Sequence, residues 1–500
     1  MNDHCADVVV LGSGFAGSLA ATLLAKQGHS VSLLERAQHP RFAIGESSTP
    51  LADFKLQQIA KHHDLPKLAA LSRYGTWVEQ CPHLMRGAKR GFAYFSHHEG
   101  RAFHSDDRHA GELLVTANSS QQQADTHWLR SDVDAFFVEQ AIASGVNFID
   151  QAAIVSSDPG SPMRLRCERR GDPFTITTRF LIIASGNPQL WNQAISIPAT
   201  GPVPRTDTRA LFAHFADVQP WSQVMRELGF STSDHPFDCD QSALHHVFDG
   251  GWMWQLRFDD GTMSAGFLID NHRHAHSLDP SPVAQWHRWM RRFPSIAKQF
   301  EKATVVRPQA GMQQIDRLQH RLRRVAGENW ALLPAAVGYA DPLFSTGIAH
   351  SLFSVERLVT AIGELGHPAR LSESLADYST RLAQEIDLID RFVSLAYRAS
   401  SSFAQYVVAT MPYFAAATSC ERAARNAQPT AAPAFLLADD AAFLAAMRSI
   451  EDAHVRLRGV ADAAATVEFE EQVRQALKPF NHVGLLAPDS LRMYRHTAAE

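Results

Sequence analysis

The sequence predicts an α/β fold in which a parallel-sheet domain is interleaved with a β-rich domain and followed by a helical C-terminal region. A short β-branched strand near the N-terminus, Asp7–Leu11, breaks into glycines and then into an Ala/Leu-rich helix, which is typical of the start of a strand–helix–strand unit. Strands alternate with loops and helices to about residue 365, and from about residue 366 the pattern is helical alone. A chain of 500 residues has room for two or three domains.

The glycines after the first strand have a spacing with a physical role. Gly12, Gly14 and Gly17 follow the G-x-G-x-x-G pattern, and Ser18–Gln27 continues as the helix. The first glycine permits the tight turn, the second lets a pyrophosphate approach backbone N–H groups, and the third allows close helix–strand packing. The positive end of the helix dipole then favours the phosphate charge. This unit predicts a Rossmann-like dinucleotide-binding domain.

Two further features refine the nucleotide prediction. A second strand, Ser30–Leu34, ends at Glu35, where an acidic side chain can hydrogen-bond a ribose. An apolar strand, Phe180–Ala184, closes on Ser185 and Gly186. Flavoproteins with two dinucleotide-binding folds use such a small-residue turn to bring the chain back beside the first glycine loop. The sequence therefore favours FAD over NAD.

Composition argues against several classes of function. The net charge of −5 gives no basic footprint for nucleic acid, and 45% hydrophobic with 20% charged residues is ordinary for a globular protein. The five cysteines are scattered without a C-x-x-C pair, so we expect neither a disulfide framework nor a zinc site. The first residues lack the pattern of a signal peptide, and we expect a protein of the reducing cytoplasm.

Histidine is frequent, with 25 residues. The adjacent pairs His62-His63, His97-His98 and His245-His246 point apart on either a helix or a strand and make poor chelating pairs, so we expect no metal site. The stretch 392–420 is rich in aromatic residues and alanine, but polar residues such as Arg398 argue against a membrane span. We expect it to form a buried or cavity-lining surface.

Some polar positions have roles that the residues alone leave open. The loop Arg41–Pro50 either covers a cofactor or merely leads into the next helix. Leu84–Phe95 is predicted to be one strand, with Lys89 on the opposite face from Phe92 and Tyr94. A lysine in such a position is usually solvated.

The next segment, 101–123, is polar and is predicted to be an excursion or loop. Arg130 is expected just before a helix at Ala135–Ser144, which Ser131 or Asp132 could cap. There Arg130 either meets a phosphate or ribityl chain or is solvated.

Two other patterns have both a structural and a functional interpretation. Trp252 and Trp254 share one face of a strand whose hairpin partner is Gly261–Ile269, and they form either a core pair or part of a site. Ser345-Thr346-Gly347 precede a helix at Ile348–Leu365. Exposed N–H groups at a helix start suit an isoalloxazine carbonyl or a halide ion, and the alternative is a simple helix cap.

Taken together, four stretches resemble the flavin-dependent halogenases, within the wider aromatic-hydroxylase flavoprotein family. They are Gly12–Gly17, Gly45-Glu46-Ser47-Ser48-Thr49-Pro50, Trp252-Met253-Trp254 and Asp341-Pro342-Leu343-Phe344-Ser345-Thr346-Gly347. The resemblance covers roughly residues 1 to 365, and the double-tryptophan strand is its most specific part because it separates halogenases from hydroxylases in the family. It implies a glutathione-reductase-type FAD-binding domain interleaved with a β-rich substrate domain.

The resemblance also implies a reaction. A separate NAD(P)H-flavin reductase would supply FADH2, and oxygen would serve to oxidise chloride or bromide to hypohalous acid. The acid would pass through a tunnel to an active-site lysine beside an electron-rich aromatic carbon. Lys89 is the match for this lysine, with Lys55, Lys61 and Lys67 as rivals in helix or loop positions.

Other roles follow from the resemblance by position. Ser345, Thr346 and Gly347 would hold the halide through backbone N–H groups. Trp252, Trp254 and Phe344 would line the tunnel and shield the flavin. The expected cofactor-binding residues are Gly12, Gly14, Phe15, Ala16, Gly17, Glu35, Arg36, Gly45, Glu46, Ser47, Ser48, Arg130, Gly186, Asp341, Gly347 and Ile348.

The sequence departs from the family pattern at three places. Leu256-Arg257 follow the tryptophan strand where Ile-Pro is usual, and Pro334-Ala335-Ala336 replace Gly-Asp-Ala, which weakens the expected flavin-ribityl contact. Phe344 stands where free-tryptophan halogenases carry a glutamate that acts on the substrate. We therefore expect a phenol, resorcinol, pyrrole or aryl-polyene precursor, free or on an acyl carrier protein.

The leading hypothesis is thus an FADH2-dependent halogenase of secondary metabolism. The alternatives are a flavin monooxygenase or reductase of the same fold and a non-catalytic flavoprotein subunit of a biosynthetic complex. The expected boundaries are an FAD-binding domain in three parts (1–100, 125–190 and 326–365), an excursion at 101–124, a β-rich substrate domain at 191–325 and a helical region at 366–500.

Overall fold

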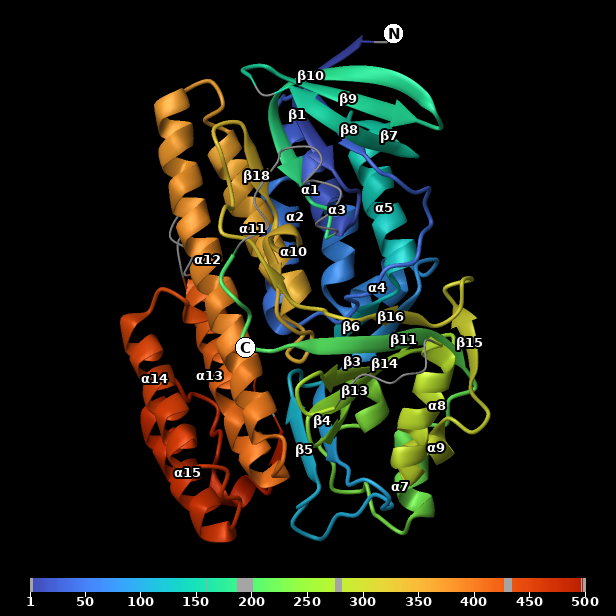
Figure 1. Cartoon of the computed structure of the whole chain (residues 1–500), viewed down its shortest axis with the longest axis vertical. Coiled ribbons are helices and arrows are strands. Elements are labelled where there is room, and N and C mark those ends of the chain that lie inside the picture. The colour runs from blue at the N-terminus through green and yellow to red at the C-terminus, as the bar shows by residue number, and fades with distance from the viewer. Residues whose placement is uncertain are drawn as a thin grey trace.

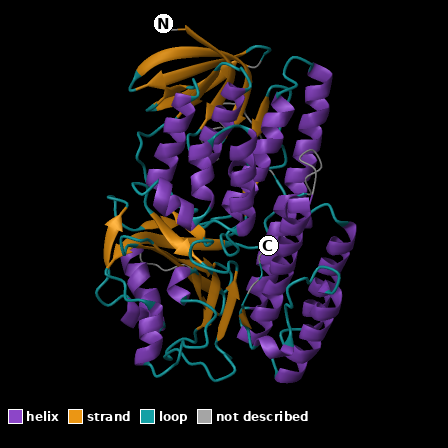
Figure 2. Cartoon of the chain, turned by 180° about the vertical axis from the view of Figure 1, so that it is seen from behind, coloured by secondary structure: helices purple, strands orange, loops and turns teal. Residues whose placement is uncertain are grey.

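Two large sheets and a helical layer make up the protein (Figure 1). The computed structural model describes residues 3–158, 160–186, 201–274, 281–426, 434–495 and 497. The helical layer runs along one side of both sheets, which lie one above the other in Figures 1 and 2. The predicted α/β class, with a β-rich part and a helical C-terminal region, is confirmed.

The first sheet has seven strands in the order β7-β2-β1-β10-β9-β8, with β18 also paired to β10. The pairs that join β7, β2, β1, β10 and β18 are parallel, whereas β8 and β9 are antiparallel additions. Its central strands are continuous apolar runs because both faces are covered. The strand bounds are β1 Asp3–Leu11, β2 Val31–Leu34, β7 Asn147–Ile149, β8 Ala152–Asp158, β9 Met163–Arg169, β10 Asp172–Ile183 and β18 Trp330–Leu332.

Helices from distant parts of the chain pack beside this sheet. Helix α1 contacts α5 and α11, and α11 contacts α2. The expected helix after the first glycines is therefore built into a core that the much later helix α11 helps to form. The bounds are α1 Phe15–Lys26, α2 Pro50–His62, α3 Pro66–Ala69, α4 Tyr74–Gln80, α5 Arg130–Ala143, α10 Pro334–Val337 and α11 Thr346–Ile362.

The second sheet has nine strands in the order β15-β11-β14-β13-β12-β4-β5-β20, with β16 paired to β11. The predicted hairpin of the tryptophan strand is confirmed, since β13 and β14 pair antiparallel. Helices α8 and α9 contribute to a separate hydrophobic core on this sheet. The bounds are β4 Gly91–Ser96, β5 Glu112–Thr116, β11 Thr208–Ala216, β12 Ala243–Phe248, β13 Gly251–Arg257, β14 Met263–Asp270, β15 Thr304–Arg307, β16 Gln313–Ile315, β20 Met493–Tyr494, α7 Trp221–Glu227, α8 Pro282–Arg292 and α9 Pro294–Gln299.

The prediction of one strand over Leu84–Phe95 is wrong. The chain forms β3, Arg86–Lys89, which pairs with β6, Asp125–Trp128, and it then enters the large sheet as β4. Between them Arg90 leaves both ladders, and its N–H donates to Gln241 O. Because the strand is interrupted, the alternation of side chains that would have placed Lys89 on the opposite face from Phe92 does not apply. The expected excursion at 101–123 also contains a strand, β5.

The C-terminal region is helical, as predicted. Its bounds are α12 Pro368–Ala399, α13 Phe403–Asn426, α14 Ala441–Arg456 and α15 Ala463–Leu477, and β20 then adds to the sheet beside β5. The aromatic stretch 392–420 is largely buried, as expected. The loop expected between residues 426 and 434 lies almost wholly outside the described residues.

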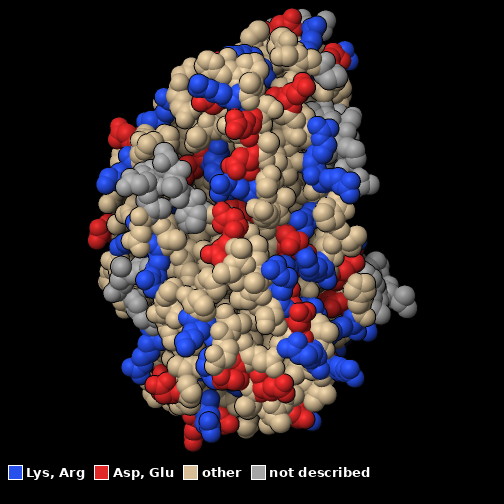
Figure 3. Space-filling model, turned by 90° about the vertical axis from the view of Figure 1, so that its left-hand side faces the viewer, with Lys and Arg blue, Asp and Glu red and all other residues tan. Residues whose placement is uncertain are grey.

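Acidic and basic side chains are interspersed over the face shown in Figure 3. Among the described helices, none is both long and apolar enough to cross a membrane.

Candidate active site

A cavity of about 610 Å³ is lined by residues from both sheets, a size typical of small-molecule sites. Of the expected cofactor-binding residues, only Ser48 does not line it. The lining includes Gly12, Gly14, Phe15, Ala16, Gly17, Glu35, Arg36, Gly45, Glu46, Ser47, Arg130, Gly186, Asp341, Gly347 and Ile348, together with Ser345, Thr346, Trp252 and Trp254.

The glycine loop has the close packing that its spacing predicts. Gly12 has a φ of 104°, and a Cβ at Gly17 would lie 2.0 Å from Gly12 O. The turn after β10 does return beside this loop, because Ala184 N donates to Leu11 O at 2.8 Å and a Cβ at Gly12 would lie 3.0 Å from Ser185 N. At the end of the first strand and the start of α1, the backbone therefore leaves room only for a narrow, polar part of a ligand.

Glu35 ends β2 at the cavity, where it is 8% exposed. Its carboxylate accepts hydrogen bonds from Ser13 N and Oγ and from Ala37 N, and it pairs with Arg41 at 3.2 Å. Burial alone would raise the pKa of Glu35, but the Arg41 charge and the N–H donors outweigh it and lower the pKa. Glu35 is thus held as a carboxylate that faces the cavity.

The structure places Arg130 as the first residue of α5 rather than before the helix. The N-cap is Leu129, without a side-chain cap, so the expectation of a Ser131 or Asp132 cap is wrong. The Arg130 guanidinium pairs with Asp134, and its Nη1 donates to Ile44 O at 2.9 Å. This pairing holds the guanidinium over the loop that edges the cavity.

Two guanidinium groups border the glycine loop. A Cβ at Gly14 would lie 3.4 Å from Arg130 Nη2 and 3.7 Å from Arg41 Nη2. Positive side chains beside the N-terminus of α1 match the negative charge of a pyrophosphate.

The start of α11 offers donors to the cavity. Ser345 occupies the N-cap with a φ of 51°, but its Oγ donates to Ser47 Oγ at 3.0 Å instead of capping, and its N–H donates to Pro342 O. Within the described part of the chain, the N–H groups of Thr346 and Gly347 have no acceptor. A Cβ at Gly347 would meet no atom within 4 Å, so this backbone faces open space.

The tryptophan strand is locked to the same loop. Trp252 Nε1 donates to Tyr397 Oη at 3.0 Å, and Tyr397 Oη donates to Asp341 Oδ2 at 2.9 Å. Burial raises the pKa of Asp341 to about 7, against the opposing effect of these donors. The partner of Trp254 Nε1 is Ser264 Oγ. Tyr397 belongs to α12, so the helical region helps to position the tryptophans.

Lys89 lies beyond the Gly45–Pro50 loop from the cavity. It is fully buried, its Nζ donates to Ser48 O at 2.5 Å, and the same atom lies 4.0 Å from the ring centre of Phe92. The expectation of a solvated lysine opposite Phe92, taken from the residues alone, is therefore wrong. Burial lowers the pKa of Lys89 to about 8, although Asp125 and Asp53 act in the other direction.

Two buried carboxyl groups accompany this lysine. Burial raises the pKa of Asp125 to about 6 against the charge of Lys89, and burial and Asp125 together raise the pKa of Asp53 well above its usual value. The charge of Asp125 therefore opposes the ionisation of Asp53. A buried lysine with a lowered pKa beside two such acids is a candidate for proton transfer.

An aromatic cluster extends from Phe92, which Lys89 contacts, to the cavity. It consists of Phe92, Tyr94, His245, Tyr406, Tyr413 and Phe414. His245 stacks on Tyr94 with ring centres 4.4 Å apart and also lines the cavity. The hydroxyls of Tyr94 and Tyr406 are buried without a hydrogen-bond partner among the described residues. Such groups are expected to meet a polar ligand or water.

Phe344 does not line the cavity. It is buried and stacks on Tyr413 with ring centres 4.4 Å apart, so it lies between the halide-loop residues and the aromatic cluster. Of the rival lysines, Lys55 is taken up by an ion pair with Glu356 at 2.7 Å, whereas Lys61 and Lys67 are exposed. Ala335, which replaces the family's aspartate, lines the cavity without a polar side chain.

Sequence reasoning missed several residues of this region. Asp53 and Asp125 were not singled out because nothing local marks them, and they meet only where α2 and β6 come together. His245 was considered only as half of an adjacent pair. Tyr397 lies in the helical region, whose pattern carries no motif.

Fold and cavity together define a protein with a Rossmann-like domain and a cavity suited to a dinucleotide. Residues 10–66 match the family model described as NAD(P)-binding Rossmann-like domain. Over its whole length the chain resembles the crystal structure of halogenase PltM in complex with phloroglucinol and FAD, with a TM-score of 0.85, 23% identity and coverage of 99% of this chain and 100% of that one.

Curated relatives agree. The chain is 27% identical over 403 residues to monodechloroaminopyrrolnitrin halogenase PrnC of Pseudomonas fluorescens, which covers 79% of this chain and 68% of PrnC. It is 22% identical over 422 residues to a chlorinase of 1H-pyrrole-2-carbonyl-(peptidyl-carrier protein) from Pseudomonas fluorescens, covering 81% and 87%. The chain is thus a homologue of the flavin-dependent halogenases, and the resemblance expected from its motifs is confirmed.

Proposed function

We propose that this chain halogenates an electron-rich aromatic compound by means of reduced FAD, oxygen and a chloride or bromide ion, with Lys89 as the catalytic lysine. The observation that carries the proposal is the arrangement around one loop. Ser47 on this loop binds Ser345 of the α11 start, and Ser48, the next residue, accepts the hydrogen bond of Lys89. A single loop thus separates the cofactor cavity from the buried lysine.

The residues of the cavity fit FAD. The glycine loop would bind the pyrophosphate beside Arg41 and Arg130, and Glu35 would bind a ribose hydroxyl. Oxygen would be the oxidant in this cavity: two electrons would come from reduced FAD and two from the halide, so that one oxygen atom ends in hypohalous acid and the other in water. Thr346 and Gly347 would hold the halide with their free N–H groups, while Ser345 N–H remains in its turn. Ala335 would leave the ribityl chain without the usual carboxylate contact.

Lys89 would hold the hypohalous acid by hydrogen bonding from its ammonium group. With a pKa of about 8 the group is mostly protonated at neutral pH, yet it transfers a proton more readily than an ordinary lysine. The carboxyl pair of Asp125 and Asp53 would keep the local charge balanced when that proton moves. Trp252 and Trp254 would keep the substrate away from the flavin.

The aromatic cluster indicates the substrate class. Stacking surfaces beside two unpartnered hydroxyls, those of Tyr94 and Tyr406, suit a planar ring with polar substituents. PltM has been crystallised with phloroglucinol, and one relative is a chlorinase of a carrier-bound pyrrole. We infer a phenol, resorcinol or pyrrole, free or carrier-bound, as the substrate here. A separate NAD(P)H-flavin reductase would be the partner.

The test is mass spectrometry of a reaction that contains FAD, a flavin reductase, NADH, bromide and a panel of phenols, resorcinols and carrier-bound pyrroles. A product with the bromine isotope doublet that is lost in Lys89→Met supports the proposal. An oxygenated product without bromine would assign the chain to the monooxygenases instead. NADH consumption without added reductase would remove the separate partner.

A further inference from the structure

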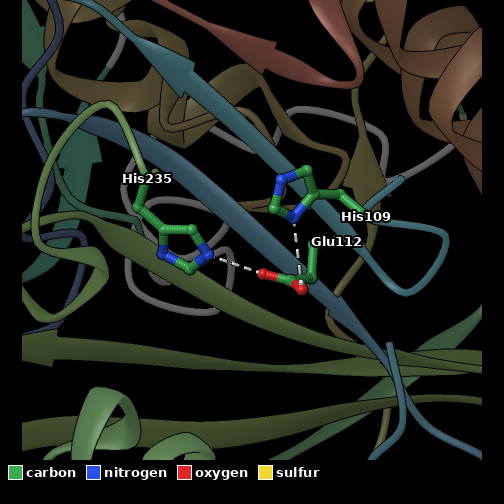
Figure 4. Close-up of side chains that lie close together, drawn as sticks. All are labelled: His109, Glu112 and His235. Carbon is green, nitrogen blue, oxygen red and sulfur yellow. Dashed lines mark hydrogen bonds and ion pairs between the residues drawn. The ribbon is translucent and has the colours of Figure 1, made fainter. Parts of the chain in front are cut away.

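A second cluster of ligand-type side chains lies at the start of β5, apart from the cofactor cavity. Figure 4 shows the Glu112 carboxylate between the rings of His109 and His235. His109 Nδ1 lies 3.5 Å from Glu112 Oε1, and His235 Nε2 lies 2.8 Å from Glu112 Oε2. The three side chains are 7%, 3% and 2% exposed for His109, Glu112 and His235. The proposed function uses none of them.

Glu112 is a buried acid that forms no ion pair with a lysine or arginine among the described residues. Its ion pairs within the described part of the chain are with these two histidines. Arg492 reaches the same loop, but its Nη1 donates to Ala110 O at 2.7 Å. An ionised carboxylate in such surroundings needs a positive partner, which here is either a proton on each ring or a metal ion.

The second nitrogen of His109 indicates which form is favoured. His109 Nε2 lies 2.9 Å from Asp234 Oδ2, a more exposed carboxylate. A carboxylate accepts, so the Nε2 proton points to Asp234, and a neutral ring turns its Nδ1 lone pair toward Glu112. Two acceptors would then face each other at 3.5 Å, which calls for either a second ring proton or a metal ion between them. The separation is long for an N–H···O hydrogen bond and suits two ligands of one metal ion better. A histidine that gives its outer N–H to a carboxylate is the usual arrangement of a metal ligand.

The chain holds these side chains in place. His109 has a φ of 56°, in the left-handed region that non-glycine residues rarely adopt. Its N–H donates to Asp106 O, and Glu112 N donates to His109 O at 3.0 Å. His235 comes from a separate segment, 126 positions further along than His109. An ion bound here would clamp two surface segments to the sheet edge where β20 pairs with β5.

We propose that His109 Nδ1, the Glu112 carboxylate and His235 Nε2 bind one Zn²⁺-like divalent ion, with Asp234 as the outer carboxylate and a fourth position left for water. Bonds of 2.0–2.2 Å in a tetrahedral site put ligand atoms about 3.4 Å apart. The two histidines approach different oxygens of Glu112, His109 Nδ1 at 3.5 Å from Oε1 and His235 Nε2 at 2.8 Å from Oε2. The three ligand atoms lie within 4.8 Å of one another, so a small rotation of the carboxylate is needed to bring one oxygen to this spacing from both rings. The prediction of no metal site considered only cysteine spacing and adjacent histidines, whereas these ligands are distant in sequence.

The test uses the full-length, untagged chain stripped with EDTA, exposed to ZnCl2 and desalted, followed by elemental analysis. We expect one equivalent of zinc in the wild type and loss of that equivalent in His109→Gln, His235→Gln and Glu112→Gln. His104→Gln, which alters an exposed histidine of the same loop, is the matched control and should retain zinc. Because a variant could misfold, circular dichroism and FAD binding are measured on each.

A second readout needs no variant. Co²⁺ bound to two nitrogens and a carboxylate in a tetrahedral site gives an intense visible absorption, and zinc should displace it one for one. Zinc should also raise the unfolding temperature of the wild type but not of Glu112→Gln. Failure of the wild type to retain zinc, or equal retention in all variants, would overturn the proposal and leave Glu112 bonded to protonated histidines. Neither result depends on halogenation.

Discussion

Replacing Lys89 with methionine separates a catalytic lysine from a structural one. Methionine keeps a long unbranched side chain but removes the ammonium group. We expect the halogenated product to fall by at least about 100-fold, because a positioned proton donor contributes 10²- to 10⁴-fold. FAD binding should be unchanged, since Lys89 does not line the cofactor cavity.

The effect on stability should have the opposite sign. The pKa of Lys89 falls from 10.5 to about 8 on burial, and at 1.36 kcal/mol per pKa unit this difference corresponds to about 3 kcal/mol. Because the pKa is lower in the folded state, the penalty is fully present below pH 8 and disappears as the pH rises toward 10.5. Lys89→Met removes the penalty, and part of the gain is offset because Asp125 loses its cation. The variant should be at least as stable as the wild type at pH 7.

The assay pairs product analysis by mass spectrometry with denaturant unfolding at pH 7. Lys55→Met is the matched control, because Lys55 is equally buried but pairs with Glu356 at 2.7 Å. That variant should lose stability and keep its product yield per folded molecule. Wild-type halogenation by Lys89→Met would refute the catalytic role. Unfolding of Lys89→Met several kcal/mol below the wild type would show that the lysine serves the fold.

The pH dependence of single-turnover halogenation should show a decline above pH 8 as Lys89 loses its proton, and a rate that stays flat to pH 10 would contradict a role for the ammonium form. Gly347→Ala should fold normally because its Cβ would meet no protein atom within 4 Å, but it should weaken FAD or halide binding in a fluorescence titration. Gly17→Ala should lower both stability and FAD binding, because its Cβ would lie 2.0 Å from a carbonyl oxygen. Trp252→Phe removes the indole donor that anchors this side chain and should increase oxygenated product or free hypohalous acid relative to halogenated product, measured by product analysis with and without a scavenger. Asp341→Asn removes a carboxyl group whose pKa is raised from 3.8 to about 7 in the folded protein. The free energy of unfolding of the variant, measured relative to the wild type, should therefore increase from pH 4 to pH 7, by up to about 4 kcal/mol, and then level off.

Local patterns were enough to select residues that line one cavity in the structure. The strand, glycines and acidic strand end lie close together in sequence, and their roles depend on backbone geometry that the residue types impose. The small-residue turn after β10 and the start of α11 are likewise short segments with strong conformational preferences. All of these segments contribute residues to the lining of one cavity, whereas Ser48 and Phe344 do not line it.

The environment of Lys89 could not be predicted in the same way. Strand alternation holds only while a strand continues, and the turn at Arg90 is stabilised by Gln241, which is distant in sequence. The burial of Lys89 and its acidic neighbours Asp53 and Asp125 depends on packing among α2, β6 and α13. The same limit applies to His109 and His235, which meet only after the sheet has formed.

Part of the aromatic cluster comes from a helix that does not line the cavity, and this bears on how substitutions can alter such enzymes. Tyr406, Tyr413 and Phe414 come from α13, whereas the cofactor cavity is built without this helix. If the proposed function holds, substitutions on α13 would change the surroundings of the substrate ring without altering the cavity proposed to hold FAD. A library confined to that helix would then be a route to new acceptor molecules that leaves the cavity residues unchanged.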